Sequence, residues 1–184
     1  RVTPKETMKI CQTLYEAGLI TYMRTDSTKY SKEFIESARG FIETNYGNKF
    51  VHDSIESLAD GARKERIKKK TKKNQDNKPK DEANNAQEAH EAIRPTDVNI
   101  KEAGKDMQPK EKRMYKLIWS NSVESCMSDA NYKQMTTNID GYGGKMFRYS
   151  SEKNIFPGWK IVRGVSDTTE YYDYLLNLDK AAAF

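Results

Sequence analysis

Residues 18 to 27 read Gly18-Leu19-Ile20-Thr21-Tyr22-Met23-Arg24-Thr25-Asp26-Ser27. This run passes from apolar to polar residues, and it lies between two segments whose apolar residues recur at helical spacing. In an extended chain, side chains alternate between two faces, so Tyr22, Arg24 and Asp26 would project to one side. On a helix, Tyr22 and Arg24 would point about 200° apart. We therefore expect an extended segment that two helices hold against the body of a domain.

The flanking segments carry the signals of helix ends. The first begins at Thr3-Pro4, which supplies an N-cap and a proline at the first helical position, and Gly18 ends it. The second begins near Ser31 and stops at Gly47. The apolar face of the first comprises Met8, Cys11, Leu14 and Tyr15. The apolar stripe of the second comprises Phe34, Ile35, Ala38, Phe41 and Ile42.

A third helix and an antiparallel sheet are expected further along the chain. The helix runs from about Pro109 to Met127. Its expected buried positions include Met114, Leu117, Ile118 and Val123. Strands are expected over residues 132–139, 145–149 and 159–162, with a hairpin turn over 140–144. The fold class is therefore α+β, a mainly α domain over residues 1–128 with an attached antiparallel β segment over 129–184.

The positive charge of the chain is concentrated in one segment. The net charge is +5, yet residues 61–80 alone carry ten basic residues against two acidic ones, a local balance of +8 that leaves about −3 for the remainder. The segment lacks aromatic residues and apolar periodicity, so we expect a flexible basic loop at about 61–82. It is either a solvated insertion or a tether that adds salt-sensitive attraction to nucleic acid.

Composition excludes several classes of protein. Hydrophobic residues make up 36% of the chain and charged residues 32%, which is enough for a modest core. No apolar run approaches the ~20 residues that span a membrane, so we expect a soluble, intracellular protein. Cys11 and Cys126 have no partner at metal-ligand spacing, which favours reduced thiols and no structural zinc site.

Tyr22 and Arg24 are a candidate pair for attack on a phosphodiester. A free tyrosine has a pKa of about 10 and is a weak nucleophile at neutral pH, so a nearby cation would help it. A guanidinium binds two phosphate oxygens and offsets the negative charge of the transition state. Asp26 could orient Arg24. The alternative is that Tyr22 is a half-buried packing residue whose hydroxyl finds one partner.

Two longer strings carry a family resemblance. The first string covers residues 14–28 and consists of Leu14-Tyr15-Glu16-Ala17, the run quoted above and Thr28. It resembles the active-site segment of type IA DNA topoisomerases in the form carried by bacterial topoisomerase I. A second string resembles the histidine motif of the same family, Ala86-Gln87-Glu88-Ala89-His90-Glu91-Ala92-Ile93-Arg94-Pro95-Thr96. Residues 114–127 are similar to the helix that leads out of the nucleophile domain.

The resemblance implies a mechanism and a set of roles. Tyr22 would cleave one DNA strand through a 5′-phosphotyrosyl intermediate, and the freed 3′ hydroxyl would reseal the strand without ATP, so that the full-length enzyme relaxes negatively supercoiled DNA. Arg24 and His90 are the other implied catalytic residues. The implied DNA contacts are Arg94, Asp26 and Ser27. Residues 129–184 would be part of the β arch of a multi-domain toroidal enzyme, ending at a truncation.

The resemblance also sets expectations for cofactors and partners. Magnesium would bind a domain of the full-length enzyme outside this chain, so the isolated chain is expected to hold no cofactor and to be inactive. The implied partners are single-stranded or underwound DNA and other domains of the same enzyme, in the cytoplasm or wherever the source keeps its DNA. Two alternatives remain open: a non-enzymatic module that binds single-stranded nucleic acid, and an interaction domain whose basic loop docks an acidic partner.

Overall fold

The computed structural model describes residues 2–60, 91–164 and 170–176. The chain divides into two compact units, Arg1–Met127 and Ser128–Phe184, and each is described here by itself. His90 and the predicted basic loop at about 61–82 lie outside the described residues. The fold is mixed α+β, with helices in the first unit and an antiparallel hairpin in the second. That the units are a tyrosine domain and a partial arch stays a prediction.

The first helix, α1 (Pro4–Glu16), is capped at both ends as the sequence predicts. The Thr3 hydroxyl accepts a hydrogen bond from the backbone three residues on, at 3.2 Å. At the other end Gly18 adopts φ +69°, and the Leu19 N–H donates to the Leu14 carbonyl at 3.0 Å. This is the Schellman arrangement, which needs a left-handed residue and therefore favours glycine. It turns the chain out of α1 directly into the segment that bears Tyr22.

The buried face of α1 differs from the predicted one. Cys11 and Leu14 are buried as expected, together with Ile10, but Met8 and Tyr15 are 38% and 41% exposed. Ile10 and Leu14 lie four residues apart, on the same side of the helix, and this side faces the core. Tyr15 is displaced by about 100° from Leu14 around the helix, so the prediction that Tyr15 packs in the core face was wrong.

The second helix, α2 (Lys32–Asn45), matches its prediction. The Ser31 hydroxyl caps it by accepting the Phe34 N–H at 3.3 Å. All five residues of the predicted apolar stripe are buried. Two short elements follow, the 3₁₀ helix η1 (Asn48–Phe50) and the helix α3 (Ser57–Asp60).

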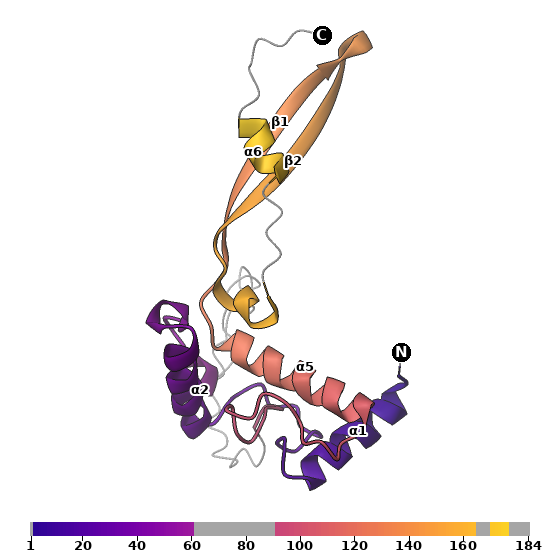
Figure 1. The fold of residues 1–184 in the computed structure, drawn as a ribbon, viewed down its shortest axis with the longest axis vertical. Helices are drawn as coiled ribbons and strands as arrows, with labels where there is room; N and C mark the ends of the chain where they lie inside the picture. Colours follow the sequence, from indigo (N-terminus) through magenta and orange to yellow (C-terminus); the bar gives the residue numbers. More distant parts are fainter. Residues whose placement is uncertain (1, 61–90, 165–169, 177–184) are drawn as a thin grey trace, which may run out of the picture. The chain divides into compact units, whose positions relative to one another are not determined.

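The long helix α5 (Pro109–Ser125) packs against α1 (Figure 1). Its core face carries Tyr115, Trp119 and Val123, which recur every four residues and are all buried. Leu117 is 46% exposed, so its predicted burial was wrong.

Two aromatic residues fix the orientation of α5. The Tyr115 hydroxyl donates to the Ile100 carbonyl at 2.6 Å, and the Trp119 indole N–H donates to the Val98 carbonyl at 2.8 Å. Burial, with a smaller contribution from the Asp97 carboxylate, raises the pKa of Tyr115 to about 12. Each side chain therefore buries its aromatic ring while its polar group keeps a hydrogen-bond partner. The helix turns this face to the core, and the neighbouring face with Leu117 and Met114 is more exposed.

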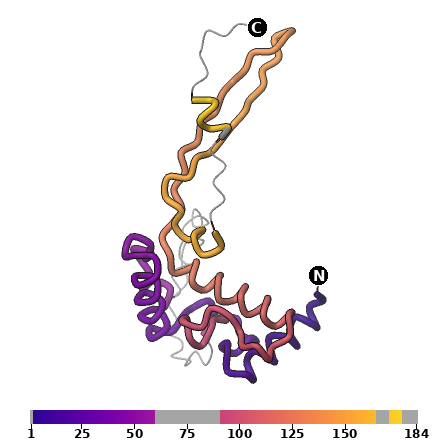
Figure 2. The backbone as a smooth tube through the Cα atoms, in the orientation of Figure 1, coloured from indigo at the N-terminus to yellow at the C-terminus, as the bar shows by residue number. Residues whose placement is uncertain are grey.

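The second unit is built on a long hairpin. Strand β1 (Asn131–Gly141) pairs antiparallel with β2 (Lys145–Phe156), and the turn is the 3₁₀ element η2 (Tyr142–Gly144). Figure 2 shows the two strands running side by side, with the helix α6 (Glu170–Leu176) against them. The two predicted strands and their turn are confirmed, and both strands are longer than predicted.

The third predicted strand, over residues 159–162, was wrong. These residues belong to the 3₁₀ helix η3 (Gly158–Arg163). Gly158 has φ +50°, and a Cβ at this position would lie 2.5 Å from the carbonyl oxygens of Ser128 and Asp129. The Trp159 N–H donates to the Ser128 carbonyl at 2.9 Å. This close backbone approach turns the chain after β2 and prevents it from continuing as a strand.

Candidate active site around Tyr22

Residues 91–96 of the second motif lie beside the chain that leads from α1 to Tyr22. Ile20 and Pro95 form an isolated antiparallel bridge. On one side of it the Thr21 N–H donates to the Arg94 carbonyl at 2.9 Å, and on the other the Thr96 N–H donates to the Leu19 carbonyl at 3.0 Å. Residues more than seventy positions apart therefore form a short piece of sheet. Tyr22 is the residue that follows this piece.

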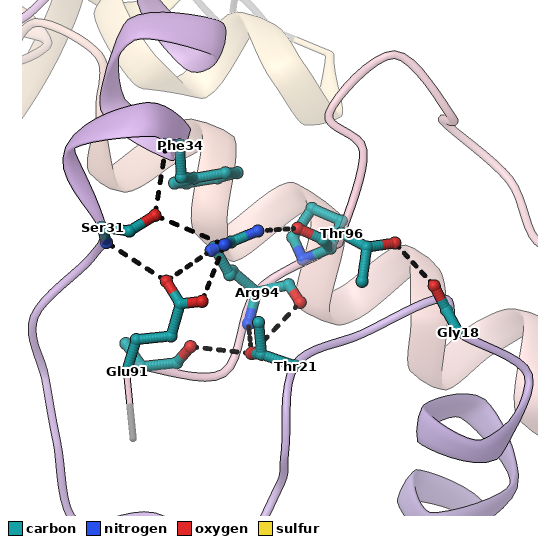
Figure 3. A network of polar contacts seen from close by, with 9 residues as sticks. Gly18, Thr21, Ser31, Phe34, Glu91, Arg94 and Thr96 are labelled. Carbon is teal, nitrogen blue, oxygen red and sulfur yellow. Dashed lines mark hydrogen bonds and ion pairs between the residues drawn. The ribbon is translucent and has the colours of Figure 1, made fainter. Parts of the chain in front are cut away.

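Side-chain hydroxyls reinforce the pairing. The Thr21 hydroxyl donates to the Ala92 carbonyl at 2.8 Å and accepts the Arg94 N–H at 3.0 Å (Figure 3). The Thr96 hydroxyl donates to the Gly18 carbonyl at 2.7 Å. The backbone that leads from α1 to Tyr22 is thus held at both of its ends, which suits a side chain that must meet a single reacting atom.

Arg94 is the centre of a part-buried polar network. Its Nε and Nη2 donate to the two oxygens of the Glu91 carboxylate at 2.8 and 2.7 Å, a bidentate pair. Nη1 donates to the Pro95 carbonyl at 2.9 Å. Figure 3 shows the guanidinium between the Glu91 carboxylate and the ring of Phe34, whose centroid is 4.7 Å away. A cation over an aromatic face is a favourable contact.

The same network reaches the start of α2. The Glu91 carboxylate also accepts the Ser31 N–H at 3.1 Å, and an Arg94 nitrogen lies 3.4 Å from the Ser31 hydroxyl. A carboxylate near a helix N-terminus is further favoured by the helix dipole. The network therefore joins the second motif to α2, while Thr21 joins it to the Tyr22 segment.

This geometry gives Arg94 a structural role. The side chain of Arg94 is 13% exposed and that of Glu91 29% exposed. Most of its N–H groups are engaged within the protein, which leaves little of the guanidinium for a phosphate. The predicted contact of Arg94 with DNA stays a prediction.

The backbone around Arg94 is not helical. Pro95 limits any helix in the second motif to a short one, and within residues 91–96 the structure has no helix but bends at Ile93 and Thr96 and the bridge at Pro95. A residue before proline is disfavoured in the α region, and pairing with residues 19–21 satisfies the extended backbone instead. His90 itself lies outside the described residues.

Tyr22 is half-buried and contacts another tyrosine. Its ring centroid is 5.2 Å from that of Tyr15, with the ring planes at 65°. The next residue, Met23, is buried, and Arg24 is exposed. The chain bends at Leu19 and again at Met23 and Arg24, so the continuous extended conformation predicted for residues 19–26 was wrong.

The side chains at and after the bend alternate in exposure. Arg24 and Asp26 are exposed, whereas Met23 and Thr25 on either side of Arg24 are more buried. Among the hydrogen bonds and ion pairs of the described residues, none belongs to the Arg24 guanidinium. Ser27 is in a local turn, in which its hydroxyl accepts the Lys29 N–H at 3.3 Å.

The described residues also bear on metals and membranes. Within residues 2–60, 91–164 and 170–176, no three potential ligands among His, Cys, Asp and Glu lie close enough to hold a metal ion. In the same ranges, no helix has the length and hydropathy needed to cross a membrane.

Three residues of the site were missed from the sequence. Thr21, Ser31 and Glu91 hold the network together, and none of them was singled out for that role. For Glu91 the opposite charge of the nearby Arg94 was the available signal, although a spacing of three favours an ion pair on a helix and this backbone is not helical. For Thr21, no local signal exists, because its partners are more than seventy residues away.

Comparisons with known proteins agree with the two motifs. A family profile described as DNA topoisomerase matches residues 1–182. The chain is 39% identical over 161 residues to DNA topoisomerase 1 of Escherichia coli K12, which covers 86% of this chain and 16% of that protein. DNA topoisomerase 1 of Fervidobacterium islandicum is 37% identical over 167 residues, with 85% and 21% covered.

A solved structure is also similar. Full-length topoisomerase I from Thermotoga maritima superposes with a TM-score of 0.64 at 30% identity, over 88% of this chain and 24% of that chain. The chain therefore spans a quarter or less of the length of these relatives. Because the family profile matches almost the entire length of this chain, the chain belongs to the bacterial type IA DNA topoisomerases.

Proposed function

We propose that this chain carries the nucleophile of a longer type IA DNA topoisomerase, and that the nucleophile is Tyr22. The observation that carries the proposal is the double hydrogen bond between Thr21 and Arg94, which joins the two family motifs next to Tyr22. Family membership supports the same assignment. A tyrosine mounted on a fixed backbone, with an exposed arginine two residues on, suits attack on a phosphodiester.

The reaction is a transesterification. The Tyr22 hydroxyl oxygen forms a bond to phosphorus and loses its proton, the bond from phosphorus to the 3′ oxygen breaks, and that oxygen takes up a proton. The product is a 5′-phosphotyrosyl bond and a free 3′ hydroxyl, and resealing runs the same steps in reverse. One phosphodiester replaces another, so no nucleotide is consumed as fuel.

The other predicted residues have roles that follow from charge and position. Arg24 would bind the non-bridging oxygens of the attacked phosphate and stabilise the charge of the transition state. His90 would donate a hydrogen bond or move a proton to the leaving oxygen. Asp26 and Ser27, on the same segment as Arg24, would contact the DNA strand. Arg94 would keep this segment in place through its hydrogen bonds with Thr21.

Magnesium, which the family resemblance associates with the longer enzyme, is not part of these steps. From the family resemblance alone, we propose that magnesium binds a region of the longer enzyme outside this chain. We propose single-stranded or underwound DNA as the substrate, relaxation of negative supercoils as the activity of the longer enzyme, and a location with the DNA of the cell.

The test is the covalent adduct. In the full-length enzyme, a 3′-labelled single-stranded oligonucleotide is incubated with the protein and the mixture is denatured. The wild type should retain label on the protein, and Tyr22→Phe should retain none. Tyr46→Phe is the matched control, because Tyr46 is also half-buried, and it should form the adduct normally. Label retained by Tyr22→Phe would reject the proposal, and a wild type that binds DNA but never forms an adduct would favour the non-enzymatic module.

A further inference from the structure

Tyr15 occupies an unusual place for a large aromatic residue. It lies in the last turn of α1, one residue after the fully buried Leu14, yet 41% of it is exposed. Its ring meets the ring of Tyr22 at a centroid distance of 5.2 Å and an angle of 65°, which is the edge-to-face geometry. The side chain therefore contributes little to the core and directly borders the proposed nucleophile.

The backbones that carry both rings are fixed. Leu19 donates to the Leu14 carbonyl and closes the end of α1, which sets where Tyr15 lies. Thr21 is held by its bonds to the second motif, and Met23 is only 5% exposed. With the backbone held on both sides, the direction of the Tyr22 hydroxyl is set by the two side-chain torsions of Tyr22 and by the contacts of its ring, of which that with Tyr15 is one.

We propose that Tyr15 is a positioning residue for Tyr22, whose ring keeps the nucleophile in the rotamer that presents its hydroxyl to DNA. This inference rests on the proposed role of Tyr22. A tyrosine has three staggered wells at its first torsion, and in-line attack on phosphorus uses a narrow range of directions. A neighbouring ring edge excludes some of these wells and stabilises the one that it contacts.

The expected effect is moderate. Access to three wells instead of one lowers the reactive fraction by about threefold. The edge-to-face contact is what favours the reactive well, so its loss is already contained in this factor, and the rate of cleavage should fall by about threefold. DNA affinity should not change, because Tyr15 acts through Tyr22 and not through the strand.

The experiment uses the full-length enzyme with a 3′-labelled single-stranded oligonucleotide at saturating concentration. Rate constants of single-turnover cleavage and of resealing are measured, with the dissociation constant of the oligonucleotide and the melting temperature. Tyr15→Ala and Tyr15→Leu should cleave and reseal about threefold more slowly, with unchanged dissociation constant and melting temperature. Tyr15→Phe keeps the ring and should match the wild type. Met8→Ala, on the same helix and 38% exposed, is the matched control and should also match it.

Several results would overturn the inference. One is a folded Tyr15→Leu protein that cleaves and reseals at the wild-type rates. Another is a Tyr15→Phe protein that is as slow as Tyr15→Ala. A third is a loss of DNA affinity that accounts for the whole decrease in the rate of cleavage. The Tyr22→Phe variant separates this failure from that of the proposed function. If Tyr22→Phe loses the adduct while Tyr15→Leu reacts normally, only the positioning role fails, whereas an adduct in Tyr22→Phe removes the premise of both.

Discussion

Thr21 and Arg94 exchange hydrogen bonds in both directions: the Thr21 N–H and, at 3.5 Å, the Thr21 hydroxyl donate to the Arg94 carbonyl, and the Arg94 N–H donates to the Thr21 hydroxyl. The two bonds of the hydroxyl with Arg94, and its bond to the Ala92 carbonyl, depend on the Thr21 side chain. The residue next to Tyr22 therefore links two distant segments of the chain.

Thr21→Val tests this link. Valine has a similar shape but no hydroxyl, so the part-buried N–H of Arg94 and carbonyl of Ala92 lose their partner. We expect the free energy of unfolding to fall by about 1–3 kcal/mol, as measured by urea denaturation followed by circular dichroism. Thr21→Ser keeps the hydroxyl and should lose less. Equal stability of the valine variant and the wild type would contradict the role of the hydroxyl.

Arg94→Lys tests the polar network. Lysine keeps the charge but cannot make the bidentate pair with Glu91 or lie flat over Phe34, so we expect a loss of about 1–3 kcal/mol in stability. The partner variant Glu91→Gln should destabilise as well, and the double variant should cost less than the sum. Strict additivity would show that the two side chains act independently.

The salt dependence of DNA binding tests the predicted contact of Arg94 with DNA. A phosphate contact predicts that Arg94→Met lowers the slope of log affinity against log salt by about 0.7 for single-stranded DNA. Because the guanidinium is engaged within the protein, we expect the slope to stay unchanged.

Arg24→Ala should separate catalysis from stability. Arg24 is exposed, so its removal should change the free energy of unfolding by less than about 0.5 kcal/mol. If it binds the attacked phosphate, single-turnover cleavage by the full-length enzyme should slow by about 100-fold or more. Arg24→Lys should recover part of the rate through its charge. Wild-type cleavage by Arg24→Ala would exclude Arg24 from the reaction.

The two cysteines should resist alkylation in the folded chain. Burial raises the pKa of the Cys126 thiol to about 12 and also raises the pKa of Cys11. Alkylation requires the thiolate, and a pKa of about 12 leaves only ~10⁻⁴ of Cys126 ionised at pH 8. Mass spectrometry after iodoacetamide at pH 8 should show no adduct on Cys126 in the native chain and adducts on both thiols in urea. Rapid native labelling of Cys126 would contradict its burial.

Gly158→Ala should destabilise the second unit. Its Cβ would approach the carbonyl oxygens of Ser128 and Asp129 to 2.5 Å, in addition to the strain of φ +50°. Gly143→Ala is the matched control, because Gly143 also has a positive φ, of +75°, but open space around it. The control should cost about 1–2 kcal/mol and Gly158→Ala more, seen as faster hydrogen exchange in β1. Equal costs would show that the contact is relieved by small shifts.

Local signals predicted the helices well. The caps at Thr3 and Ser31, the stop at Gly18 and the apolar stripe of α2 all depend on residues within one or two turns, and all are confirmed. The face of α5 was predicted less well, because the partners of Tyr115 and Trp119 are carbonyls in another segment. The strand expected over residues 159–162 failed for a similar reason, since the approach of Gly158 to residues 128 and 129 is a tertiary contact.

The site divides in the same way. Its motifs were visible as strings of residues, but the extended segment expected to place Tyr22, Arg24 and Asp26 on one side is interrupted by bends at Met23 and Arg24. The supporting residues were not visible, because Thr21 and Ser31 act through carbonyls and carboxylates that approach only in the folded chain. The roles of Tyr22, Arg24, His90, Asp26 and Ser27 stay predictions.

The separation of 73 positions between Thr21 and Arg94 also has a consequence for biosynthesis. At translation rates of about 5–20 residues per second, the ribosome needs about 4–15 s after adding Thr21 to add Arg94. During that interval the nascent polypeptide already contains Tyr22 but not the partner that orders the backbone next to it. Any chemistry at Tyr22 that needs this ordered backbone would therefore begin only after Arg94 has been added and has paired with Thr21.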